Sequence, residues 1–188
     1  MLQRKSVWSV LLGGFCVVGL TGCFASEVDD TPSTAPIAAS TFGSEEEARV
    51  AADTAYTNYL AATNSAGQSG GQDTSGLAAT TTKDWLAHET NSYVEILQMG
   101  RMQQGVVTFD RLILQQVTET TASVHITVYA CMDLSQVVTV DTSTGANPLR
   151  PESMLHPIEV AFESSDKARE KLVVSSQSPW QGENFCLS

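Results

Sequence analysis

The first 22 residues limit what the rest of the chain can be, because they have the layout of a secretion signal. Arg4 and Lys5 precede an apolar run over residues 7–20, and no acidic residue lies in either part. A basic start followed by a short apolar run is typical of a secretory signal peptide. The run is shorter than the about 20 apolar residues that a bilayer-spanning helix needs. We therefore expect residues 1–22 to direct export and then to be removed.

A cleavage motif closes this run. Leu20-Thr21-Gly22-Cys23 resembles the bacterial lipobox, in which an aliphatic residue, two small residues and a cysteine define the cleavage point. The resemblance implies that the Cys23 thiol receives a diacylglycerol and becomes the acylated N-terminus. Several acyl chains anchor a protein stably where a single chain is marginal. We expect a lipid anchor in the cell membrane, with the protein on its extracytoplasmic face; the alternative is an ordinary secretory signal that contains a cysteine.

The charge of the mature chain excludes several kinds of partner. Both cations of the first segment leave with it, so eight cations face 21 acids and the net charge becomes −13. Such a domain repels phosphate backbones and anionic lipid headgroups. We expect no nucleic acid as a partner and contact with the membrane only through the lipid.

Two of the four cysteines remain available to the folded domain. Cys16 lies in the apolar run and Cys23 is the acylation site, which leaves Cys131 and Cys186. Thiols pair in oxidising, exported compartments. We expect a disulfide between these two residues, which closes a loop of about 56 residues and contributes about 4 kcal/mol in the chain-entropy model. The alternative, a pair of free redox-active thiols, lacks a C-x-x-C motif.

Composition divides the mature chain into a tether and a domain. Residues 24–43 are rich in Ser, Thr, Ala and Pro. Such a segment has little apolar surface to offset its ordering entropy, so we expect residues 23–43 to form the lipidated N-terminus and a flexible tether. At roughly 5–6 Å × √n its span is about 25 Å. A single domain is then expected over residues 44–188.

Helical patterns come first in this domain. Residues 44–47 form a capping box, S-x-x-E, at the start of an amphipathic helix. A Gly-rich loop is expected over residues 64–78, and a second helix over residues 81–99 with Gly100 as its cap. The side chains expected on the buried faces of the two helices are Ala48, Ala51, Ala52, Ala55, Tyr56, Tyr59 and Leu60, followed by Trp85, Leu86, Tyr93, Val94, Ile96 and Leu97.

Strand patterns follow the helices. We expect a long or bent strand over residues 106–117, a strand over 123–131, a short one over 137–140, and a terminal hairpin of 156–164 and 171–177. Alternation with period two places four residues of the second strand on one face: Val124, Ile126, Val128 and Ala130. Helices followed by antiparallel strands indicate an α+β fold, with the N-terminal helices packed on a curved antiparallel sheet.

This layout is similar to a group of small actinobacterial lipoproteins, whose exported domains resemble the nuclear transport factor 2-like, or cystatin-like, α+β cone. The resemblance rests on the lipobox, the acidic tether, the strand end Cys131-x-Asp133, and Trp180 close to Cys186. It spans residues 44–188 and implies a cone with a cavity between helix and sheet.

Related isomerases and dehydratases use an Asp or a His in this cavity to move a proton. His88, His125 and Asp110 are the candidates. We expect His88 on an exposed helix face, His125 at a solvent-facing or cavity-rim position, and Asp110 at a bend or in a surface pair. His88-Glu89-x-x-Ser92 lacks the second histidine of the H-E-x-x-H zinc motif. We therefore expect no catalytic residue, no metal site and no cofactor.

Two functions remain. The first is a non-catalytic binding or interaction module, whose protein partner the sequence does not identify, with a homodimer through the sheet. The alternative is a small-molecule-binding or isomerase-like cone, with Tyr56, Tyr59, Trp85 and Tyr93 lining the cavity. A cavity filled by these rings favours the first, and an open one that holds an ionisable group with a shifted pKa favours the second.

The lipid anchor is testable with one substitution. Cys23→Ala removes the thiol that carries the lipid, so the variant should leave the membrane fraction and the detergent phase of a phase-partition assay. Unchanged partitioning would refute the anchor.

Overall fold

The structure is a computed structural model that describes residues 40–187, apart from residues 147, 153, 166 and 167. The expected signal peptide, the acylation site Cys23 and residues 24–39 of the expected tether lie outside the described residues. Within the described residues, no helix is both long enough and apolar enough to cross a membrane.

Helix α1 (Glu45–Gln68) begins at the predicted capping box. The Ser44 hydroxyl accepts a hydrogen bond from the Glu47 amide at 3.1 Å, while the Glu47 carboxylate accepts one from the Gly43 amide at 2.8 Å. These bonds satisfy amide donors that a helix start leaves free. The apolar face is buried as predicted, except that Ala51 is half-buried: Ala48, Ala52, Ala55, Tyr56, Tyr59 and Leu60.

Helix α2 (Lys83–Gln98) follows a short 3₁₀ turn, η1 (Leu77–Ala79). Thr82 caps its start by accepting a hydrogen bond from the Trp85 amide. Gly100, which was expected to end this helix, follows the last turn with a φ of 62°, a left-handed conformation that glycine adopts without strain.

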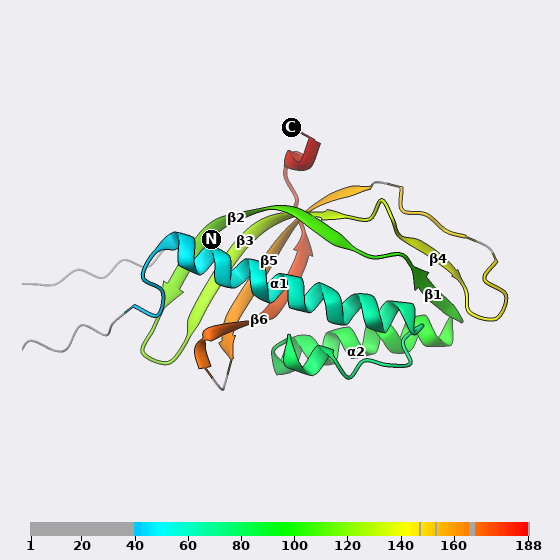
Figure 1. The fold of residues 1–188 in the computed structure, drawn as a ribbon, viewed down its shortest axis with the longest axis horizontal. Coiled ribbons are helices and arrows are strands. Elements are labelled where there is room, and N and C mark those ends of the chain that lie inside the picture. The colour runs from blue at the N-terminus through cyan, green and yellow to red at the C-terminus, as the bar shows by residue number, and fades with distance from the viewer. Residues whose placement is uncertain (1–39, 147, 153, 166–167, 188) are drawn as a thin grey trace, which may run out of the picture. The chain divides into compact units, whose positions relative to one another are not determined.

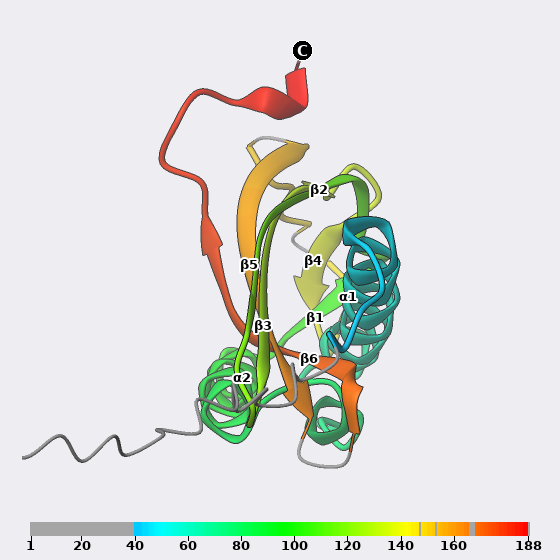
Figure 2. The same ribbon diagram turned by 90° about the vertical axis from the view of Figure 1, so that its left-hand side faces the viewer.

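Four antiparallel strands form the main sheet in the order β2 (Thr108–Glu119), β3 (Val124–Asp133), β5 (Leu155–Ser165) and β6 (Ala168–Pro179). Figure 1 shows α1 lying across this sheet, and in Figure 2 the C-terminal segment leaves on the side opposite α1. The alternation predicted for β3 is confirmed, because Val124, Ile126, Val128 and Ala130 are almost fully buried beneath α1. The fold is thus α+β, with helices packed on an antiparallel sheet.

The long strand β2 is bent, as its length suggested. Its register with β3 shifts between Asp110 and Leu112, where Arg111 has a φ of 58°, and again between Leu114 and Gln116. Extra residues of this kind bend a strand and increase its twist. Of the two roles expected for Asp110, a bend or a surface pair, the register shift beside it supports the bend.

A second, two-stranded sheet pairs β1 (Arg101–Gln104) with β4 (Val138–Asp141). Strand β1 was not predicted, because Arg-Met-Gln-Gln carries neither β-branched residues nor alternation. The chain between α2 and β2 therefore holds a strand of its own, and the short strand expected near residues 137–140 pairs with it rather than with the main sheet.

Two helix predictions were wrong. Helix α1 continues to Gln68, so the predicted loop over residues 64–78 begins only after it. Val94 and Leu97 of α2 are exposed rather than buried, with 43% and 45% of their surface accessible. The outer side of α2 is not covered by the described part of the chain. Of the residues predicted to be buried on α2, Tyr93 is buried, and Trp85, Leu86 and Ile96 are partly buried.

The chain enters the domain through a clasp at the end of β2. The Glu119 carboxylate accepts hydrogen bonds from the Ser40 hydroxyl at 2.9 Å and the Thr41 amide at 2.8 Å, and Arg169 of β6 approaches it at 3.8 Å. Phe42 follows into the core. The folded unit therefore includes the last residues of the segment expected to be a tether.

Cys131 of β3 and Cys186 of the last turn, η2 (Phe185–Leu187), are placed as a disulfide, with their Cα atoms 5.6 Å apart. Tyr129 of β3 packs beside them against Trp180 and Phe185. The bond and these rings together hold the C-terminal segment to the outer face of the sheet.

Cys186→Ala should lower the free energy of unfolding by about 2–4 kcal/mol, because it removes a cross-link between residues 55 positions apart. Chemical denaturation without reductant measures the change. Leu187→Ala is the matched control, since Leu187 is 75% exposed and should leave the midpoint unchanged. If reductant fails to shift the wild-type midpoint, the cross-link is absent.

Candidate functional site

A recess of about 170 Å³ opens between the two helices and the sheet. Helix α1 contributes Tyr59, Leu60 and Thr63, and α2 contributes Glu89 and Tyr93. The rest of the wall comes from the strands and the turn before β2: Gln103, Val107, Met132 and Gln177. The recess has room for about six water molecules at ~30 Å³ each, so it suits a ligand smaller than a typical drug.

Among the described residues that line this recess, Glu89 is the one acidic residue. Burial raises the pKa of its carboxyl group, and this effect outweighs the hydrogen bond from Tyr59 and the charge of His88, which both lower the pKa. A carboxyl group whose pKa is raised in this way holds its proton to higher pH than an exposed one. It can act as a hydrogen-bond acceptor, as a counter-ion or as a proton donor.

A chain of hydrogen bonds connects Glu89 to its neighbours. The Trp85 indole N–H donates to the Tyr59 hydroxyl at 3.3 Å, and that hydroxyl donates to Glu89 Oε1 at 3.0 Å. Burial, followed by the nearby charge of Glu89, raises the pKa of the Tyr59 hydroxyl. The hydroxyl therefore stays protonated and remains a donor to the carboxylate.

The other tyrosines are also engaged within the domain. The Tyr93 hydroxyl donates to the Thr63 carbonyl at 2.9 Å, and the Tyr56 hydroxyl donates to Gln177 Oε1 at 2.8 Å. These bonds join α2 to α1 and α1 to β6, so they fix the distances across the recess.

The position of Glu89 follows from how α2 is attached to the sheet. The backbone around Thr81 pairs with β6, since the Thr82 amide donates to the Val174 carbonyl and the Val174 amide to the Thr80 carbonyl, both at 2.9 Å. Behind α2, a Cβ at Gly71 would overlap the Tyr93 carbonyl, so only glycine permits this close approach. Contacts at Thr82 and at Tyr93, on either side of Glu89 along the helix, thus fix the position of α2.

The four aromatic residues expected to line a cavity are brought together, but in different roles. Tyr59 and Tyr93 line the recess, while Trp85 supports Tyr59 from behind. Tyr56 is fully buried and packs against Phe109 and Phe162. The interior beneath α1 is therefore filled by rings, and the recess lies beyond them.

Sequence reasoning did not identify Glu89 as a site residue, because residues 88–92 match only an incomplete zinc-binding motif. A signal was present, since Trp85, Glu89 and Tyr93 recur at spacing i, i+4, i+8 and share one face of α2. A carboxylate that shares a helix face with two aromatic residues expected to be buried is itself expected to be partly buried.

The three residues considered for proton transfer lie apart from this recess. His88 is exposed and stacks on Trp85 with ring centroids 4.5 Å apart, and His125 is exposed beside Glu163. Asp110 is exposed at the bend of β2. Over the described ranges, no group of three or more His, Cys, Asp and Glu side chains is placed to hold a metal ion.

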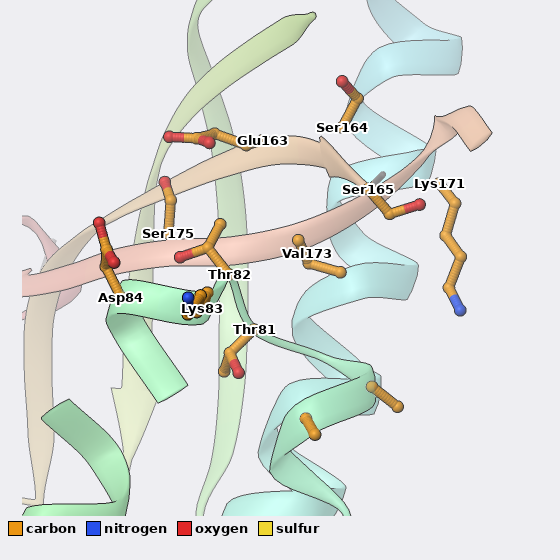
Figure 3. A pocket seen from close by; sticks show the side chains of 12 residues that line it. Thr81, Thr82, Lys83, Asp84, Glu163, Ser164, Ser165, Lys171, Val173 and Ser175 are labelled. Atoms are coloured by element: carbon orange, nitrogen blue, oxygen red, sulfur yellow. The ribbon is translucent and has the colours of Figure 1, made fainter. Parts of the chain in front are cut away.

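Two other hollows are less suited to recognition. One of about 460 Å³ lies between the start of α2 and the β5–β6 hairpin, and Figure 3 shows Lys171 at the opposite end from Asp84 and Glu163. Side chains of both charges line it. The Thr82 and Ser164 hydroxyls already accept hydrogen bonds from the backbone amides of Trp85 and Val124, respectively. The other, of about 520 Å³, lies between α1 and residues 106–109 and is lined by no titratable group.

No protein-family model and no curated protein sequence matches this chain. Among solved structures, the intermembrane space region of the chloroplast protein ARC6 is similar in fold, with a TM-score of 0.52 and 12% identity over 71% of this chain and 97% of that one. A conserved protein from Planctomyces limnophilus gives a TM-score of 0.35 at 10% identity, covering 72% of this chain and 99% of that one. A de novo β-sheet design gives 0.27 at 15% identity, covering 74% and 92%. The first match shows a shared fold and carries no information on activity.

The raised pKa of Glu89 makes a prediction about stability. Its ionised form is disfavoured in the folded state, so the wild-type protein should lose stability as the pH rises from about 4.3, the ordinary Glu value, through the raised pKa. Glu89→Gln keeps an acceptor for Tyr59 but never ionises. The variant should therefore melt at a higher temperature than wild type at pH 7, and the difference should vanish near pH 4.

Glu95→Gln is the matched control, because Glu95 is exposed on the same helix and should melt like the wild type at each pH. Burial raises the pKa of Tyr56, Tyr59 and Tyr93, so these groups stay neutral over the range tested. A Glu89→Gln protein that is less stable than wild type at pH 7 would contradict the pKa shift.

Proposed function

We propose that this chain is a membrane-anchored exported lipoprotein whose α+β domain is a non-catalytic binding module. Its ligand occupies the recess between α1, α2 and the sheet. This combines the interaction module and the small-molecule site that the sequence left as alternatives. The cone of nuclear transport factor 2-like proteins remains the family resemblance that we propose for the domain.

One observation carries the binding proposal. Glu89 is the one carboxylate in a wall that otherwise consists of aromatic, aliphatic and uncharged polar side chains, at the surface of a recess that the packed core of the described residues does not fill. A burial penalty on a charged group is rarely retained without a role in structure or function. Glu89 accepts a single hydrogen bond, from Tyr59, within the described chain, so a ligand is the natural second partner.

The anchor rests on the sequence of residues 1–23 alone. Its support is the coincidence of a basic start, a short apolar run and Leu-Thr-Gly before Cys23. An exported position also agrees with the placement of Cys131 and Cys186 as a disulfide. A homodimer through the sheet stays a prediction, which sedimentation analysis of the purified protein can test.

A second function is favoured by a specific contact. The Tyr59 hydroxyl lies 3.0 Å from Glu89, so a proton can pass between a bound substrate and the carboxylate while Tyr59 stabilises the charge. This is the isomerase-like alternative, with Glu89 in place of the Asp or His expected from the sequence.

Filling the recess tests the binding site. Thr63→Phe places a ring in the recess and should abolish the amide shift changes that small polar probes, one neutral, one anionic and one cationic, produce at residues lining it. Thr57→Phe is the matched control, since Thr57 is exposed on the same helix and lines a different hollow. Shift changes that persist in Thr63→Phe, or none at the recess, would contradict the proposal.

Catalysis is distinguished by isotope exchange. A probe that binds should be recovered from D₂O without deuterium in its carbon–hydrogen bonds if the module is non-catalytic. Deuterium that enters with wild-type protein, but not with Glu89→Gln, would replace binding by proton transfer as the function.

A further inference from the structure

We infer that the recess selects a small organic cation with N–H donors, a primary alkylammonium group being the chemical class that fits it. The inference rests on the proposed binding function and names the ligand for the same site. It follows from the charge and the hydrogen-bonding capacity of the residues that line the recess, and from the volume of the recess.

The described lining of the recess contains a carboxylate and no cationic side chain, and His88, whose charge lowers the pKa of Glu89, is not part of that lining. Glu89 is its one titratable carboxylate, and none of the nine residues that line the recess is Lys, Arg or His. A partly buried carboxylate carries a desolvation penalty, which for Glu89 exceeds the effect of the His88 charge, and a bound cation lowers this penalty whereas a bound anion increases it. The large negative charge of the whole chain acts in the same direction.

Most donors of the wall and of the groups behind it are already used within the domain. The hydroxyls of Tyr56, Tyr59 and Tyr93 donate to Gln177, Glu89 and Thr63, respectively. The Trp85 indole donates to Tyr59. The Gln103 amide nitrogen donates to Asn64 at 2.8 Å. Among these donors of the described residues, the Gln177 side-chain amide nitrogen is the one for which no hydrogen bond within the domain is seen.

Acceptor capacity remains in the same wall. Glu89 Oε1 receives one hydrogen bond and Oε2 receives none from the residues that the structure describes. The Thr63 hydroxyl donates to the Leu60 carbonyl at 3.1 Å and keeps its own lone pairs for a ligand. A wall with free acceptors and engaged donors is matched by a ligand rich in donors, and a primary ammonium group has three.

The remaining surface suits the alkyl part of such a ligand. Tyr59 and Tyr93 present aromatic rings, and Leu60, Val107 and Met132 present apolar side chains. An aromatic face attracts a cation within about 6 Å of the ring. The volume of about 170 Å³ limits the ligand to a short chain.

The test uses the full chain in mild detergent and three probes of similar shape, n-butylammonium, n-butanol and butyrate, titrated at pH 7.5 by NMR. We expect n-butylammonium to bind at least tenfold more tightly than the other two, with shift changes at Thr63, Glu89 and Tyr93. Tetramethylammonium, which is a cation without N–H donors, should bind more weakly than n-butylammonium.

Variants then distinguish whether the recess binds a ligand at all from whether it selects an alkylammonium ion. Glu89→Gln should weaken n-butylammonium at least tenfold and leave n-butanol unchanged, while Glu95→Gln should alter neither. If n-butanol or butyrate binds as tightly as the amine and Thr63→Phe blocks it, the recess is a ligand site but the cation selectivity is overturned. If none of the probes shifts the recess residues, both the ligand class and the proposed function are overturned.

Discussion

The close packing of α1 on the sheet is the constraint on which the rest of the domain depends. Alanines at 48, 52 and 55 lie on the buried face of the helix, whose backbone runs closest to β6 and β2, and Tyr56 packs against Phe109 and Phe162. Interiors packed to this density leave few voids. The interior is therefore closed beneath the first half of α1, and open space remains where Tyr59, Leu60 and Thr63 meet α2.

This packing was largely visible in the sequence, since period-two alternation in β3 and the apolar face of α1 both predicted buried positions that the structure confirms. The end of α1 was not visible, because Asn64-Ser-Ala-Gly-Gln68 has low helix propensity. Long-range bonds override it: the Asn64 side chain accepts from the Val107 amide at 2.8 Å and donates to the Val107 carbonyl at 2.9 Å. A local sequence pattern cannot predict these bonds, because Val107 lies 43 residues from Asn64 in the sequence.

The recess was only half predictable for a similar reason. Tyr59 and Tyr93 were expected to line a cavity because of the resemblance to the cone fold, whereas the place of Glu89 depends on how α2 is fixed against β6 near Thr81 and Val174. That attachment turns one face of α2 toward α1 and leaves Val94 and Leu97 outside. A single helix can thus carry both a partly buried carboxylate on one face and exposed apolar side chains on the other.

The clasp at Glu119 has a mechanical consequence. If Cys23 is held in a membrane as proposed, tension on the chain enters the domain where Ser40 and Thr41 bond to Glu119, and Arg169 shares that load with β6. Phe42 and the Ser44 cap lie immediately behind this point. Pulling would therefore strain the end of β2, the start of β6 and the first turn of α1 before it reached α2.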